Sequence, residues 1–199
     1  MFKNILKLAT CTLLATVISL TAANASEIKD NTELKHSVLL YGAKFTPDSL
    51  QDIISNDHSM DSSYLVALAW NREFARNFSH LGWETEVQMV KHFGGQHNME
   101  FNALIAMRWH RFPWDRYVKT SFAVGEGLSL ATRKPKLEQE NRSKSSALLN
   151  YLMFDLTLAP PASRWYWSLR IHHRSGIFGL FDGVGGASNF IGSGIGFRF

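Results

Sequence analysis

The expected mature part of this chain lacks cysteine, long hydrophobic runs and a strong charge of either sign. The one cysteine among 199 residues is Cys11, in an N-terminal segment that we expect to be removed, so disulfides and thiolate metal sites are excluded. Beyond that segment no run of about 18 apolar residues occurs, which excludes transmembrane helices. Two of the 21 basic residues, Lys3 and Lys7, lie in the segment, so 19 remain against 17 acidic residues. This near balance excludes a strong nucleic-acid footprint.

Residues 1–25 have the composition of an export signal. A basic start precedes an apolar run over residues 13–20, and Ala23-Asn24-Ala25 is a small-residue cleavage motif. We therefore expect a signal peptide over residues 1–25 and a mature chain that begins at Ser26.

Apolar and polar residues then alternate in segments of about ten residues, separated by turn-forming stretches. Between Leu81 and Phe93, for example, the odd positions are mostly apolar, whereas the even ones include Glu84, Glu86 and Gln88. Such strands have one apolar and one polar face. The eight predicted strands are His36–Phe45, Ser63–Arg76, Leu81–Phe93, Asn98–Phe112, Arg116–Leu130, Ala147–Ala159, Arg164–Gly176 and Ser188–Phe199.

The connections between these strands alternate in length, with one exception at residues 94–96. The short ones are residues 77–80, 113–115 and 160–163, and the long ones are residues 46–62, 131–146 and 177–187. Short periplasmic turns and long outer loops are typical of outer-membrane barrels. The sequence therefore predicts an all-β protein: an eight-stranded antiparallel transmembrane β-barrel of the bacterial outer membrane, formed by residues 26–199.

A soluble, lipocalin-like barrel is the alternative, in which the apolar faces of the strands point inward. Against it, the polar faces of the strands carry Glu84, Glu86, Glu100, Arg108 and Arg170. The lumen of a small barrel is just wide enough for side chains to fill, so these opposite charges can pair across it. The apolar faces of the strands are then expected to face lipid.

The seventh segment carries candidate chemistry on its apolar face. Trp167, Leu169 and Ile171 share the odd parity with His173 and Ser175. A histidine and a serine two residues apart on a strand have neighbouring side chains, which suits a base and a nucleophile. Polar groups on a lipid face cost on the order of 1–3 kcal/mol, so their presence calls for a reason. The alternative role for His173 is contact with lipid headgroups.

These features resemble the lipid A 3-O-deacylase (PagL-type) family. The resemblance is carried by the number of segments, the H-x-S motif on the outward face of the seventh, and the terminal aromatic residue Phe199. It implies a Ser-His-Glu hydrolase site on the outer barrel wall, which removes an ester-linked acyl chain from lipid A. Ser175 would be the nucleophile and His173 the general base. The implied partner is the lipid A of outer-leaflet lipopolysaccharide, and no cofactor is implied.

The third catalytic residue departs from that family. The family's acidic position falls at about Asn189, and no glutamate follows Glu140. An amide can orient an imidazole but does not stabilise imidazolium by charge. Asp182, in the last outer loop, is the alternative third member. The family's asparagine after the nucleophile is replaced by glycine, so the backbone amides of Gly176 and Ile177 are the expected oxyanion donors.

Two further functions stay open. One is a non-catalytic structural or adhesive outer-membrane barrel that keeps the scaffold but lacks the acid. The other is a porin, which is disfavoured because eight strands leave no aqueous lumen.

The histidines show no metal-motif spacing, so the sequence predicts no metal site. The histidines that could form a metal site by their number are His92, His97, His110, His172 and His173.

Overall fold

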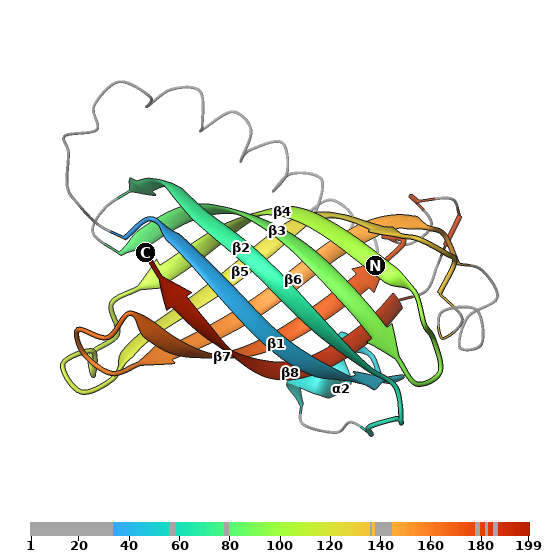
Figure 1. Ribbon diagram of the computed structural model, residues 1–199, viewed down its shortest axis with the longest axis horizontal. Helices are drawn as coiled ribbons and strands as arrows, with labels where there is room; N and C mark the ends of the chain where they lie inside the picture. The colour runs from blue at the N-terminus through green and yellow to red at the C-terminus, as the bar shows by residue number, and fades with distance from the viewer. Residues whose placement is uncertain are drawn as a thin grey trace, which may run out of the picture. The chain divides into compact units, whose positions relative to one another are not determined.

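The described part of the chain is a closed antiparallel β-barrel of eight strands in chain order, in which the first strand pairs with the last (Figure 1). This computed structural model describes residues 34–55, 59–77, 80–135, 137, 145–177, 180–181, 183–184 and 187–199. The predicted signal peptide and Asp182 lie outside the described residues. The elements are β1 (His36–Thr46), α2 (Leu50–Ile54), β2 (Tyr64–Asn77), β3 (Leu81–Phe93), β4 (Met99–His110), β5 (Lys119–Ala131), β6 (Leu148–Ala159), β7 (Trp165–Ser175) and β8 (Ala187–Arg198).

The predicted fold class is confirmed, with strand boundaries that mostly differ by one or two residues. The largest difference lies between β4 and β5, where the sequence predicted a short turn and a strand from Arg116. The chain instead turns over residues 111–118. Asp115 Oδ1 accepts a hydrogen bond from Thr120 N at 3.1 Å, and Trp114 Nε1 donates to Thr120 Oγ1 at 2.8 Å. These side-chain bonds to Thr120 stabilise the longer turn and delay the start of β5.

The outward face of the barrel is apolar and exposed. Its exposed residues include Leu40, Val66, Leu68, Val87, Met89, Phe101, Ile105, Leu128, Leu130, Leu169 and Ile195. Trp109, Trp165 and Trp167 are also exposed, near strand ends, as interfacial aromatic residues are. A continuous apolar surface of this kind needs lipid around it. With the closed barrel fold, it places the protein in the bacterial outer membrane.

No helix in the described part of the chain is long and apolar enough to cross a membrane.

The lumen of the barrel is filled by paired charges. The Arg170 guanidinium donates to both carboxylate oxygens of Glu86, at 2.7 and 3.1 Å. Arg108 donates to Glu84 at 2.8 Å and to Asp155 at 3.0 Å. The predicted pairing across the lumen is therefore confirmed, with Asp155 as a further member because it also accepts from Arg170. Burial in a low dielectric requires such partners.

Nearer the long loops, the lumen is filled by a histidine–carboxylate group. Glu100 lies between His172 and His92, whose Nε2 atoms are 2.9 and 2.8 Å from its two oxygens. The hydroxyl of Tyr41 is 2.9 Å from the other ring nitrogen of His172. All four side chains are buried. This packing closes the lumen at the level of these four side chains.

Candidate functional site

The last two strands bring His173 and Asn189 together on the outer wall, near the end of the barrel that carries the long loops. His173 is the direct cross-strand partner of Asn189, and Ser175, the last residue of β7, is the partner of Ala187. Partners in an antiparallel pair have Cβ atoms roughly 5 Å apart. We call His173, Ser175 and Asn189 the outer-wall site.

The imidazole of His173 is held by a relay of two hydrogen bonds. Its Nδ1 lies 2.5 Å from Oδ1 of Asn189. The amide nitrogen of Asn189 donates in turn to the backbone carbonyl of Asp48 at 2.7 Å. Because that carbonyl can only accept, it fixes which end of the amide faces the histidine.

This relay also fixes the tautomer of His173. Oδ1 of Asn189 has no proton to give, so Nδ1 of His173 must be the donor. In the neutral ring Nε2 is then unprotonated and able to accept a proton. The side chain therefore holds the tautomer that a general base needs, although no carboxylate contributes to it.

The described part of the first outer loop, residues 47–55 and 59–63, reaches this pair through Asp48. His173 and Asn189 are only 8% and 3% exposed, although the sequence predicted that they face lipid. The loop contains α2, whose first turn is fixed by a reciprocal capping box between Ser49 and Asp52. Figure 1 shows α2 beside the adjoining ends of β1 and β8. The carbonyl of Asp48, just before the helix, reaches Asn189, so the loop supplies a group that parity alone did not reveal.

Ser175 is half-buried and lies between β6 and β8. Within the described part of the chain, the Ser175 hydroxyl makes no hydrogen bond to His173 or to any other residue. Its cross-strand partner on β6 is Asn150, which is 7% exposed. Asn150 was missed by the sequence reasoning, but its outward parity in an apolar strand was the signal that could have found it.

The predicted oxyanion residues begin a tight turn directly after Ser175. Ile177 has φ 45°, in the left-handed region that β-branched residues rarely adopt. A Cβ on Gly176 would lie 2.0 Å from the carbonyl oxygen of Val184, so only glycine allows this approach. The carbonyl of Gly176 accepts from the amide of Phe181 at 3.1 Å. Among the described residues, the amides of Gly176 and Ile177 are engaged by no backbone carbonyl. The alternative acid, Asp182, lies outside the described residues.

A shallow groove of about 580 Å³ runs over the outer wall from β7 to β2. Ile191, which lines it, lies two residues along β8 from Asn189 and shares its outward parity. His173, Ser175 and Asn189 do not line the groove themselves, but Ile191 brings one end of it near Asn189. Its lining residues are Gly42, Ala43, Lys44, Tyr64, Leu65, Val66, Trp167, Leu169, Ile191, Gly192 and Ser193.

No model of a known protein family matches the chain, and no curated protein matches its sequence. Solved structures match its fold. The outer membrane enzyme PagL superposes with a TM-score of 0.55 at 12% identity, over 80% of this chain and 97% of PagL. Neisserial surface protein A (NspA) superposes with a TM-score of 0.50 at 8% identity, over 85% of this chain and 100% of NspA. At these identities the likeness shows the fold alone, which is that of the outer-membrane barrels.

Proposed function

We propose that this barrel is a lipid A 3-O-deacylase of the PagL type, an ester hydrolase that removes an acyl chain from lipopolysaccharide in the outer leaflet. The observation that carries the proposal is the relay from His173 through Asn189 to the carbonyl of Asp48, next to Ser175. The relay ties the first outer loop to the barrel wall, and it also leaves Nε2 of His173 free to accept a proton two residues from a serine hydroxyl, which suits a general base.

In the first half of the reaction, Nε2 of His173 takes the hydroxyl proton of Ser175. The serine oxygen forms a bond to the ester carbonyl carbon, and the carbonyl oxygen becomes an oxyanion. The amides of Gly176 and Ile177 donate to that oxyanion, and each such donor is worth about 2.7–4 kcal/mol in comparable sites. The bond to the sugar oxygen then breaks, and this oxygen leaves with the proton from His173.

In the second half, water hydrolyses the acyl-enzyme. A water molecule gives a proton to Nε2 of His173 and attacks the acyl carbon, and the serine oxygen leaves and regains the proton. The products are a free fatty acid and a deacylated lipid A. Asn189 acts throughout as a positioning residue, because it keeps Nδ1 protonated and Nε2 available.

The groove gives the acyl chain a place to lie. Its wall is formed by apolar side chains such as Trp167, Leu169 and Val66, and Gly42 opens space in its floor. A chain bound along the wall stays in the apolar part of the leaflet while its ester reaches Ser175. The substrate therefore does not have to leave the membrane.

The proposal is tested with purified barrel in detergent micelles that contain lipid A. We expect release of one fatty acid per lipid A, seen as the matching mass loss, and at least a 10³-fold lower rate for Ser175→Ala and His173→Ala. Ser163→Ala, at the opposite end of the barrel, is the matched control and should retain the wild-type rate. Unchanged lipid A in the presence of correctly folded wild-type barrel would refute the proposal.

The non-catalytic structural or adhesive barrel is the second candidate. The observation that favours it is the lack, among the described residues, of a carboxylate hydrogen-bonded to His173 and of a bond between His173 and Ser175. Catalytic hydrogen bonds are often formed only with substrate bound, so the deacylase remains the preferred function. The micelle assay separates the two directly.

A further inference from the structure

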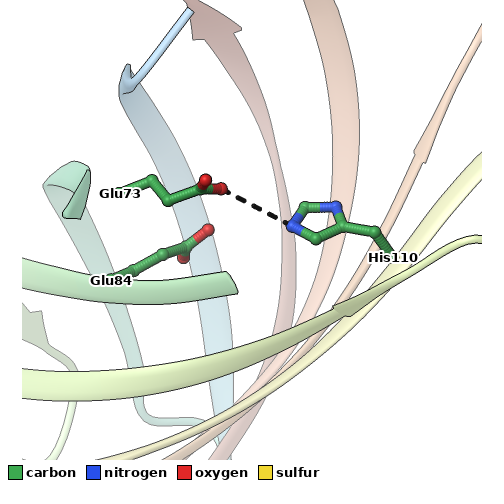
Figure 2. A group of neighbouring side chains, drawn as sticks. All are labelled: Glu73, Glu84 and His110. Carbon is green, nitrogen blue, oxygen red and sulfur yellow. Dashed lines mark ion pairs between the residues drawn. The ribbon is translucent and has the colours of Figure 1, made fainter. Parts of the chain in front are cut away.

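A third group of polar side chains lies in the lumen, at the end of the barrel opposite Ser175. Glu73 comes from β2, Glu84 from β3 and His110 from the end of β4, and the three point toward one another (Figure 2). One ligand atom from each lies within 4.8 Å of the others, and His110 Nε2 is 3.7 Å from Glu73 Oε2. We call these three residues the periplasmic cluster.

The backbone brings the two carboxylates of the cluster face to face. Glu73 and Glu84 are direct cross-strand partners, an arrangement that is unfavourable for like charges. The register of β2 against β3 shifts between Glu73 and Ala75, and such bulges often re-aim a side chain. Gly82 leaves room for the convergence, because a Cβ there would lie 3.0 Å from Glu73 Oε2 and 3.1 Å from His110 Nε2.

Two atoms of the cluster are buried without a hydrogen-bond partner among the described residues. Glu84 is 8% exposed, and its Oε2 makes no hydrogen bond among the described residues. The same holds for Nε2 of His110. A buried carboxylate oxygen and a buried imidazole nitrogen are costly to leave without hydrogen bonds, and the 3.7 Å contact of His110 Nε2 with Glu73 Oε2 is too long for one. Both residues belong to the converging set, so one bound cation would satisfy the two atoms together.

Arginines hold the other carboxylate oxygens in place. Arg76 Nε donates to Glu73 Oε1, and Arg108 Nε donates to Glu84 Oε1, both at 2.8 Å. Partners of this kind orient ligand groups around a metal. Arg76 Nη2 also lies 2.6 Å from Glu73 Oε2, so that single contact must move when a cation binds.

We propose that the periplasmic cluster binds a divalent transition metal, with Zn²⁺ the best match. Glu73 Oε2, Glu84 Oε2 and His110 Nε2 would be its three protein ligands. Zinc accepts carboxylate and imidazole together at tetrahedral geometry, whereas Ca²⁺ and Mg²⁺ prefer sites made of oxygen alone. The cluster lines a cavity of about 320 Å³, which leaves the fourth position to water. The ligands join three strands, so the metal also offsets the repulsion between Glu73 and Glu84.

Zinc titration by calorimetry tests this site, with tag-free full-length barrel in detergent after removal of metal by a chelator. We expect one high-affinity Zn²⁺ per barrel, and affinity at least about tenfold lower for Glu84→Gln and for His110→Ala. His97→Ala removes an exposed histidine from the loop between β3 and β4 and should leave the affinity unchanged. The proposal would be overturned if wild-type barrel bound Zn²⁺ only weakly or bound other than one ion per barrel.

Two further measurements keep the result interpretable. Each variant is checked for heat-modifiable migration on a gel, and Glu84→Gln keeps the acceptor for Arg108, so we expect it to fold. Replacement of Zn²⁺ by Co²⁺ should give the visible absorption of a tetrahedral site in wild type and lose it in Glu84→Gln. Equal Co²⁺ spectra, or equal zinc affinities, in wild type and Glu84→Gln would also overturn the proposal.

Discussion

Asn189 accepts a hydrogen bond from Nδ1 of His173 at 2.5 Å while its amide nitrogen is held by the carbonyl of Asp48. The amide cannot turn over without losing the bond to Asp48. It therefore does one of the two things that a carboxylate does in a hydrolytic triad: it fixes the tautomer, but adds no charge. The effect on the tautomer and the effect of charge can therefore be measured separately by changing Asn189.

Asn189→Leu should lower the rate of lipid A deacylation by at least about 10²-fold, because nothing then holds Nδ1 protonated. The loss should stay below the ~10⁴-fold that an incorrect tautomer costs a serine protease. Initial rates in micelles measure it. A rate within threefold of wild type would show that Asn189 does not position His173.

Asn189→Asp should raise the rate about tenfold, because a charge-assisted hydrogen bond is stronger by about 1.4 kcal/mol in the charged state of the histidine. The change loses the donor to the carbonyl of Asp48, so the first outer loop should also become easier to cleave by protease. Parallel rate and proteolysis measurements check both effects. A slower enzyme with an unchanged loop would contradict the stated role of Asn189.

Gly176→Ala should abolish deacylation and leave the barrel folded. The added Cβ would lie 2.0 Å from the carbonyl oxygen of Val184, so the turn that carries Ile177 must move. Gly176 lies after the end of β7, so the strand ladder is not affected. The test compares activity with heat-modifiable gel migration, and full activity would show that this turn forms no part of the site.

The groove can be blocked without disturbing the barrel. A Cβ on Gly42 would touch only the carbonyl of Leu65, at 3.8 Å, so Gly42→Phe projects a ring into the groove. We expect deacylation of lipid A to fall at least tenfold, while hydrolysis of a short soluble ester is unchanged. Leu40→Phe, on the same outward face but outside the groove, is the control. Equal losses on both substrates would argue against an acyl-binding groove.

The lumen charges make a prediction about stability. Arg170→Met leaves Glu86 buried without its bidentate partner and should lower the free energy of unfolding by about 3–5 kcal/mol. Arg72→Gln, an exposed site on β2, should change it by less than about 0.5 kcal/mol. Urea unfolding in lipid vesicles measures both. A loss below about 1 kcal/mol for Arg170→Met would contradict the role of the paired charges.

The alternation of apolar and polar residues allowed the sequence to predict which face of the barrel each strand residue lies on. Alternation alone separated Arg170 and His172, in the lumen, from His173 and Ser175, on the outer wall. It could not reveal the carbonyl of Asp48, because a backbone group in a loop leaves no pattern in side chains. Nor could it predict that His173 is buried.

The periplasmic cluster was hidden from the sequence for a different reason. Its ligands come one each from three strands, so no spacing along the chain relates Glu73, Glu84 and His110. The register shift after Glu73 also breaks the parity of β2 at the position that matters. Spacing detects metal motifs only where two ligands share one element.

The most direct test of the central claim is the mass of lipid A from cells that carry wild-type barrel or its Ser175→Ala variant at equal abundance in the outer membrane. Lipid A from wild-type cells should lack one ester-linked acyl chain that is present in the variant. Identical spectra from both cells, with both barrels inserted, would contradict the account.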